Sequence, residues 1–260
     1  MVKLPDVAMV VPELLQRTAQ SGPPVDLRKI AALWPGLQIS LEDLERPGYL
    51  IDLGVQGGEI LVRERDRLPR RRYTVAHELG HWMLNRSNGA GQDLKAKSLH
   101  TSIEKWCDQF AAELLMPKAW VLQDLRSGQP EEFLTRVVMA PRRFRVSHQA
   151  FRLRVCELTP ASLVEVAVQS AAIRLTRHYL AGSLPEALLQ RCMENARPFL
   201  TNGNGNGCHL DTGTQSLVFR RMLSRNGQCR HWLICVMPRN KRKIPGEARE
   251  KDTKAFAKFR

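Results

Sequence analysis

Two histidines and a glutamate lie close together in RRRYTVAHELGHWMLN, residues 70–85. His77 and His81 are four residues apart, so on a helix both imidazoles lie on one face, about one turn apart. Neutral imidazole nitrogens bind zinc at about 2.0–2.1 Å, so a single ion can span that turn. Glu78 is adjacent to the first histidine, where its carboxylate can act on a water molecule held by the metal. The pattern predicts a metal centre with His77 and His81 as ligands and Glu78 as the catalytic base.

Two helices must position these side chains. The first has an apolar stripe at helical spacing, formed by Val75, Leu79, Trp82 and Met83. Gly80 costs this helix roughly 1 kcal/mol relative to alanine, a cost that a site needing close approach would explain. Residues 102–117, SIEKWCDQFAAELLMP, have the pattern of a second helix, with Ser102 as its N-cap and Pro117 as its end.

The second helix offers the missing third ligand. Catalytic zinc commonly has three protein ligands, and two histidines with one glutamate is a known set. Glu104 and Asp108 are four residues apart and share a helix face that turns partly inward, where unpaired carboxylates are costly. We therefore predict Glu104 as the third ligand and Asp108 as the acceptor for the distal N–H of one histidine. Glu113, in the more apolar end of the same helix, is the competing third ligand.

These two segments carry a resemblance to a known family. YTVAHELGH followed by IEKWCDQFAAELLMP resembles the ImmA/IrrE (PprI-like) metallopeptidases, whose pattern is roughly [FY]-T-x-A-H-E-[LI]-G-H, then E-x-x-[AC]-[ND]-x-F-A-A-x-[LI]-L-M-P. The resemblance is specific over about residues 25–120. Asp108 stands where Asn is usual, and the resulting E-x-x-x-D is similar to thermolysin-like gluzincins, where the Asp orients a zinc-bound His.

The resemblance implies a zincin-like metallopeptidase domain with zinc ligands at His77, His81 and Glu104 and a catalytic Glu78. Members of the family cleave helix-turn-helix repressors and so release genes of the stress or DNA-damage response or of mobile elements. The implied partner is therefore a protein of that class, and Mn²⁺ is the alternative to Zn²⁺. For the donor that stabilises the oxyanion, the sequence leaves four candidates open: Tyr49, Arg72, Tyr73 and His100.

The charge of the chain is concentrated in its second half. Of the net charge of +14, residues 1–120 carry +1, from 16 Lys and Arg against 15 Asp and Glu. Residues 121–260 carry +13, from 24 against 11. This asymmetry suggests an anionic partner for the second half, with nucleic acid as the first candidate.

Composition narrows the class of protein. With 43% apolar and 25% charged residues, the chain is globular rather than disordered. No apolar run approaches the roughly 20 residues of a membrane span, and no signal peptide is recognisable. The six cysteines form no C-x-x-C pair. We therefore expect a cytoplasmic protein with reduced thiols and no membrane partner.

Short elements precede the metal helix. Residues 11–34 have the pattern of two short helices, and residues 37–42 alternate like a strand. Residues 48–64 have the pattern of a hairpin, and residues 65–72, RDRLPRRR, that of a basic loop. We expect a small antiparallel sheet beside the metal site, with the hairpin edge binding the substrate backbone by strand addition.

A basic helical segment follows. Residues 131–158 fit three short helices, and APRRFRVSHQAFRLRV within them resembles a helix-turn-helix, with FRVS as the turn and Ser147 capping the second helix. The arginines expected to contact nucleic acid or a protein partner are Arg142, Arg143, Arg145 and Arg152. The competing interpretation is a helical adaptor that holds a protein substrate.

The last hundred residues resemble the family less. A strand is expected at residues 162–169, an amphipathic helix at 184–196, a flexible loop at 201–213 and a hairpin at 216–238 with an Asn-Gly turn. The basic tail that follows is expected to be mobile. The resemblance to IrrE-type proteins implies a small GAF-like sensor domain here.

The fold class predicted is therefore α+β, in three parts. Residues 1–122 form the zincin-like metallopeptidase domain, residues 123–160 the helix-turn-helix segment, and residues 161–260 a basic α+β domain with a tail. The predicted function is a zinc-dependent endopeptidase that cleaves a helix-turn-helix repressor. The alternative is a DNA-binding transcriptional regulator whose metal domain is structural or vestigial, and the intact Glu78 argues against it because a structural site needs no base.

Overall fold

The chain forms two compact units. Unit 1 comprises Met1–Trp120 and Pro141–Ala150, and unit 2 comprises Val121–Ala140 and Phe151–Arg260, so the helical segment 123–160 is shared between them. The computed structural model describes residues 4–87, 97–127, 129–169, 172–179, 190, 194, 197, 200, 207–211, 215–222 and 230–238. Within these ranges, no helix has both the length and the apolar character needed to cross a membrane.

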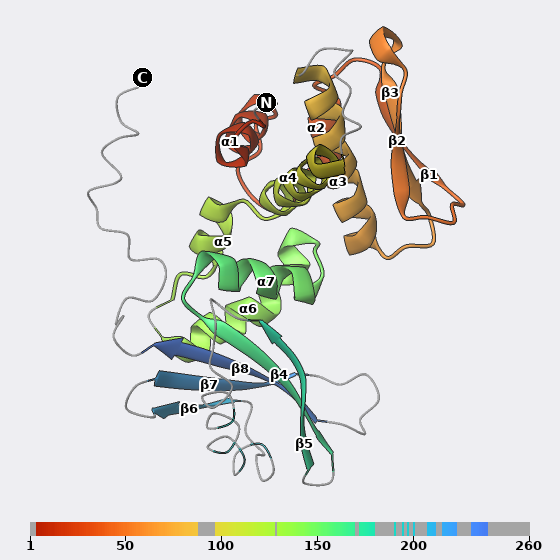
Figure 1. Ribbon diagram of the computed structural model, residues 1–260. Coiled ribbons are helices and arrows are strands. Elements are labelled where there is room, and N and C mark those ends of the chain that lie inside the picture. The colour runs from red at the N-terminus through yellow and green to blue at the C-terminus, as the bar shows by residue number, and fades with distance from the viewer. Residues whose placement is uncertain are drawn as a thin grey trace, which may run out of the picture. The chain divides into compact units, whose positions relative to one another are not determined.

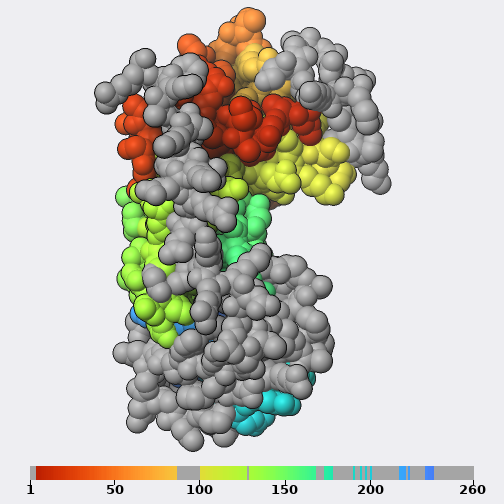
Figure 2. Space-filling view, turned by 90° about the vertical axis from the view of Figure 1, so that its left-hand side faces the viewer, coloured from red at the N-terminus to blue at the C-terminus, as the bar shows by residue number. Residues whose placement is uncertain are grey.

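Four helices belong wholly to unit 1: α1 (Val7–Arg17), α2 (Leu27–Ala31), α3 (Leu68–Ser87) and α4 (Lys97–Leu115). Asp26 caps α2, its Oδ1 accepting the backbone N–H of Arg28 at 3.0 Å. Helix α1 packs beside α4, and the indole N–H of Trp106 donates to the carbonyl of Pro5 at 2.7 Å. In the space-filling view the red atoms of α1 lie directly beside the yellow-green atoms of α4 (Figure 2).

Both metal-site helices begin earlier than predicted. Helix α3 starts at Leu68, so the second half of the expected basic loop is its first turn. Pro69 does not prevent this, because the first turn of a helix has no intrahelical partner for the N–H that proline lacks. Helix α4 starts at Lys97, and Ser102 is therefore inside the helix rather than at its N-cap.

Unit 1 also contains a three-stranded sheet, and one strand direction was predicted wrongly. Strands β2 (Gly48–Asp52) and β3 (Gly58–Arg63) form the expected antiparallel hairpin, joined through η1 (Gly54–Gln56). Strand β1 (Leu37–Glu42) pairs with β3 in parallel, so the sheet is mixed, with order β1-β3-β2. Alternating polarity specifies which face of a strand is buried but not its direction. Strand β2 is consequently an edge strand of this sheet.

Strand β2 lies close to α3. A Cβ atom on Gly48 would lie 2.6 Å from Cγ2 of Thr74 and 2.5 Å from the carbonyl oxygen of Leu61. No larger residue fits there without a shift of strand or helix. Gly48 thus allows the edge strand to pass directly along the helix that carries His77 and His81, as the ribbon of β2 beside α3 shows (Figure 1).

The helix-turn-helix segment consists of two helices rather than three, α6 (Pro130–Phe144) and α7 (His148–Leu158). Pro141 lies inside α6 and does not end it. The turn between the helices has Arg145 at φ 53°, and Ser147 Oγ accepts the backbone N–H of Ala150 at 3.1 Å, as predicted for its cap. The preceding helix α5 spans Lys118–Asp124.

Unit 2 is built on a five-stranded antiparallel sheet of order β5-β4-β8-β7-β6. Its strands are β4 (Ser162–Gln169), β5 (Ala172–Tyr179), β6 (Gly207–Asp211), β7 (Gln215–Met222) and β8 (Arg230–Pro238). The predicted strand at 162–169 and the hairpin of β7 and β8 are confirmed. Residues 207–211, predicted as part of a flexible loop, are instead strand β6, because β7 supplies its hydrogen-bonding partner.

Several predictions for the last hundred residues lie outside the described part of the chain. These are the Asn226-Gly227 turn, the tail from residue 239 onward and, apart from helical positions 190 and 194, the amphipathic helix. The apolar core that is described combines alternate residues of β4, β7 and β8, including Val164, Phe219 and Trp232. Intervening residues that point to the opposite face, including Leu163 and Leu233, are buried too, so the central strands are covered on both faces.

Arg152 is a correction to the predicted surface arginines. Its side chain lies in unit 2, is 5% exposed and forms an ion pair with Glu165 of β4. Arg142, Arg143 and Arg145 are exposed, as a contact with nucleic acid or a partner would require. Arg152 instead holds α7 to the sheet, and its burial overturns the prediction that it contacts nucleic acid or a partner.

Candidate metal centre

The two metal-site helices approach each other closely at Gly80. A Cβ atom there would lie 3.2 Å from Cys107 Sγ and 3.2 Å from Phe110 Cδ1, both on α4. The glycine therefore brings α3 near enough to α4 for short side chains to meet across the gap, as expected from its helix cost. Burial raises the pKa of the Cys107 thiol, which keeps this neighbour of the site neutral.

His77, His81 and Glu104 converge on one point. The Nε2 atoms of the two histidines lie 3.2 Å apart. Glu104 reaches both, with its Oε2 3.3 Å from His77 Nε2 and its Oε1 3.2 Å from His81 Nε2. In the described part of the chain, these three residues are the one group of His, Cys, Asp and Glu spaced to hold a metal ion.

The donor set fits a small divalent ion. Tetrahedral ligands at about 2.0–2.2 Å from zinc are separated from each other by about 3.3–3.5 Å, close to the separations of 3.2–3.3 Å found between these atoms. Two imidazole lone pairs and a carboxylate facing one another repel unless a cation or proton lies between them. The chemistry and the spacing of the three groups therefore both fit a metal site.

Asp108 fixes the orientation of His77. Its Oδ1 lies 2.9 Å from His77 Nδ1, so it accepts the Nδ1–H and leaves the Nε2 lone pair directed at the cluster. The same oxygen accepts the hydroxyl proton of Tyr73 at 2.5 Å. Burial and this hydrogen bond raise the pKa of Tyr73, which keeps the phenol a donor. The Tyr73 contact was not predicted, although its spacing of four from His77 puts both on one helix face.

Glu78 lies between the metal cluster and the edge strand. Burial is the main cause that raises the pKa of its carboxyl; the charge of Glu104 also raises it, and His77 opposes the shift. The backbone N–H of Leu50 in β2 donates to Glu78. The carboxylate thus borders both the candidate metal position and the open edge of the sheet, a proximity that no local spacing rule could have indicated.

The alternatives considered from sequence lie elsewhere. Glu113 does not join the cluster, and its Oε1 accepts the backbone N–H of Lys118 at 2.9 Å, at the start of α5. Arg72 donates to the carbonyl of Val25 at 2.8 Å. The exposed His100 lies 3.8 Å from Glu104 Oε1, and the ring of Tyr49 lies beneath Arg46.

The hydrogen bond to Asp108 predicts an effect on metal affinity. We expect Asp108→Ala to weaken zinc binding about 10–100-fold, because His77 loses the acceptor that sets its tautomer and ring orientation. Asp108→Asn should lose less, since its amide oxygen still accepts the Nδ1–H. Competition with a zinc chelator measures both affinities. Equal zinc affinity in Asp108→Ala and the unmodified protein would show that His77 is oriented without this bond.

Comparison with known proteins agrees with this geometry. Residues 36–155 match the IrrE N-terminal-like domain, a stretch that contains β1 to α4 and all the residues of the cluster. No curated protein matches the chain. A solved structure of a Mycobacterium tuberculosis transcriptional regulator is similar at 11% identity, with a TM-score of 0.49, over 90% of this chain and 76% of that one. Over residues 36–155 the chain therefore carries a domain similar to the metallopeptidase domain of the ImmA/IrrE proteins, with a His-His-Glu candidate metal site.

Proposed function

We propose that this protein is a zinc-dependent endopeptidase that cleaves a helix-turn-helix transcriptional repressor. The observation that supports it most directly is the convergence of His77, His81 and Glu104 beside the half-buried Glu78. A structural metal site gains nothing from a carboxylate next to its ligands, whereas hydrolysis needs one as a base. The match of residues 36–155 to the IrrE N-terminal-like domain supports the same class of reaction.

Each residue of the site has a distinct part in this proposal. His77, His81 and Glu104 hold the ion, and Asp108 keeps His77 in the tautomer that can bind it. A zinc ion bound there would polarise the scissile carbonyl and acidify a water molecule. The Glu78 carboxylate accepts the proton of the attacking water and then donates it to the leaving amine.

The substrate backbone is proposed to bind along β2. Among the described strands β2 pairs with β3 alone, and we propose that its other edge accepts an extended peptide. The N–H of Leu50 donates to Glu78, which places the base at that edge. A peptide added to β2 would therefore bring a scissile bond next to Glu78 and the metal cluster.

The choice of substrate is tested by direct cleavage. The purified zinc-loaded protein is incubated with helix-turn-helix repressors encoded near its own gene, and intact masses are measured by mass spectrometry. We expect one repressor to be cut at a single bond, with no cutting after chelation of the metal. Cleavage of unfolded casein as readily as any repressor would refute the repressor class while leaving the peptidase proposal standing.

The basic charge of residues 121–260 favours DNA as a second partner. If the exposed Arg142 and Arg143 bind phosphates, the DNA affinity of the full-length protein falls steeply with salt, and each phosphate that a variant no longer neutralises lowers the log–log slope by about 0.9. We expect Arg142→Gln/Arg143→Gln to lose more in DNA binding than in repressor cleavage. Arg17→Gln/Arg67→Gln, the same charge change at exposed positions of residues 1–120, is the matched control.

The opposite result would assign Arg142 and Arg143 to binding of the protein substrate. Unchanged DNA affinity together with impaired cleavage would favour the helical adaptor that holds the protein substrate.

The GAF-like sensor role implied for the last hundred residues remains part of the proposal, and the five-stranded antiparallel sheet is compatible with it.

A further inference from the structure

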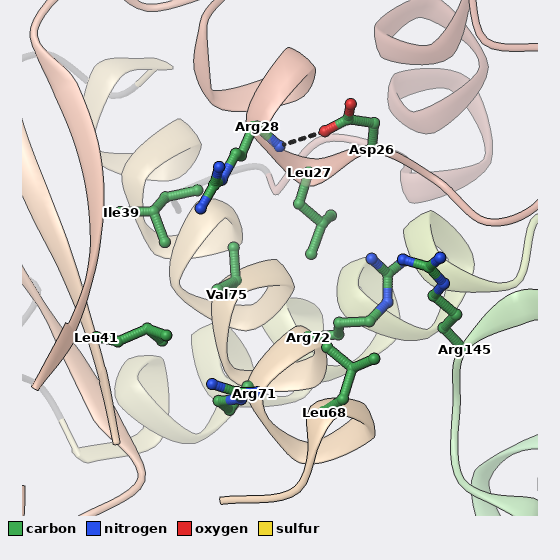
Figure 3. Close-up of a pocket in the computed structure, with 10 residues that line it drawn as sticks. All are labelled: Asp26, Leu27, Arg28, Ile39, Leu41, Leu68, Arg71, Arg72, Val75 and Arg145. Carbon is green, nitrogen blue, oxygen red and sulfur yellow. Dashed lines mark hydrogen bonds between the residues drawn. The ribbon is translucent and has the colours of Figure 1, made fainter. Parts of the chain in front are cut away.

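A cavity of about 350 Å³ lies in unit 1, away from the metal cluster. Its walls come from α2, β1, α3 and the turn that follows α6 (Figure 3). On α3 it is lined by Leu68, Arg71, Arg72 and Val75. At 100° per residue, these positions lie on the opposite side of the helix from His77. The cavity is therefore distinct from the proposed active site.

The cavity concentrates positive charge without a matching acid. Its lining includes four arginines, Arg28, Arg71, Arg72 and Arg145, and one acidic residue, Asp26. The carboxylate of Asp26 already caps α2, where it accepts two backbone N–H groups. Among the described residues, none of the four guanidinium groups forms an ion pair. The lining carries a net charge of about +3, with Arg28 and Arg145 exposed and Arg71 and Arg72 partly buried.

Two buried donors of this charge lack hydrogen-bond partners, although Nη2 of Arg72 donates to the carbonyl of Val25. The Nε atoms of Arg71 and Arg72 are buried, and neither has an acceptor among the described residues. Figure 3 shows the guanidinium groups of Arg72 and Arg145 next to each other. Burial and repulsion by Arg145 lower the pKa of Arg72. Buried donors are normally satisfied, so these groups indicate an acceptor supplied from outside the chain.

The remaining lining is aliphatic and partly open to solvent. Leu41 and Leu68 are 48% and 45% exposed, among the most exposed large apolar side chains described. Leu27, Ile39 and Val75 continue the apolar surface inward. A bare inorganic anion would leave this surface in water, so the lining fits a ligand with both an anionic head and an apolar body.

We propose that this cavity binds a small phosphomonoester with an apolar body, about the size of a mononucleotide. Guanidinium groups match phosphate oxygens in bidentate pairs, and a phosphomonoester carries a charge of about −1.5 to −2, which offsets most of the lining charge. The cavity volume lies within the range of about 300–1,000 Å³ found for small-molecule sites. The proposal does not depend on the peptidase activity.

Isothermal titration calorimetry on the full-length protein tests it with three probes: hexyl phosphate, AMP and inorganic phosphate. We expect hexyl phosphate or AMP to bind at least about tenfold more tightly than inorganic phosphate. The difference in affinity measures what the apolar body of the ligand contributes to binding. Preference for AMP indicates an aromatic body and preference for hexyl phosphate an aliphatic one. Binding of none of the probes at millimolar concentration, or equal binding of all three, overturns the proposal.

Variants locate the binding in this cavity. Arg71→Gln and Arg145→Gln should each weaken binding of the better phosphomonoester about tenfold or more, whereas Arg67→Gln, adjacent to the lining, should leave it unchanged. Leu41→Ser should weaken hexyl phosphate but not inorganic phosphate. Because Arg145→Gln removes repulsion from Arg72, its melting temperature without ligand should equal or exceed that of the unmodified protein, which excludes unfolding as the cause.

Two results would contradict the assignment. Equal losses in Arg67→Gln and Arg145→Gln would show that the phosphate binds to general surface charge rather than to the cavity. Binding of duplex DNA that depends on Arg71 and Arg145, without binding of the small probes, would assign the arginines to a nucleic-acid backbone.

Discussion

Replacing Glu78 with glutamine should abolish most of the peptidase activity while leaving the metal in place. Glutamine has nearly the same shape, and its amide oxygen can still accept the N–H of Leu50. It cannot accept the proton of the attacking water or deliver one to the leaving amine. We therefore expect the rate of repressor cleavage to fall by at least roughly 10²-fold. Elemental analysis should find close to one zinc per chain in both proteins.

Glu113→Gln is the matched control for this prediction. The same chemical change then occurs on α4, outside the metal cluster, and glutamine can still accept the N–H of Lys118. Cleavage by Glu113→Gln should be close to that of the unmodified protein. If Glu78→Gln cleaves normally while retaining zinc, the proton transfers assigned to Glu78 are wrong, and another group must act as base.

Residue spacing indicated which side chains of the metal cluster share a helix face, while Glu104 and Glu113 stayed rival third ligands. His77 and His81, like Glu104 and Asp108, are related by a helical repeat, and such a repeat fixes geometry within one element. The structure brings together His77, His81 and Glu104 as expected, and it joins His77 to Asp108.

Features that depend on contacts between distant segments could not be predicted in this way. The parallel pairing of β1, the bond from Leu50 to Glu78 and the burial of Arg152 against Glu165 each involve a partner that no local pattern specifies. The arginine cavity is the clearest example, because Arg28, Arg72 and Arg145 are brought together from three separate segments. In the sequence each of them has the appearance of an ordinary solvated charge.

The assignment of the three ligands is tested by their removal one at a time. His77→Ala, His81→Ala and Glu104→Ala should each lose most of the bound zinc, because two protein ligands hold zinc far more weakly than three. His100→Ala is the matched control, since His100 lies 3.8 Å from Glu104 but outside the cluster. It should keep close to one zinc per chain by elemental analysis.

Thermal unfolding provides a second test of the three zinc ligands. A ligand that binds only the folded state stabilises it by RT ln(1 + [L]/Kd), about 2.7 kcal/mol when zinc is at 100 times its Kd. The unmodified protein and His100→Ala should therefore melt at a higher temperature with zinc than with chelator, whereas the three ligand variants should show little difference.

The variant Glu113→Ala decides whether Glu104 or Glu113 is the third ligand. If it loses zinc and the thermal shift while Glu104→Ala keeps both, Glu113 is the ligand, and the convergence of Glu104 with the two histidines has another cause.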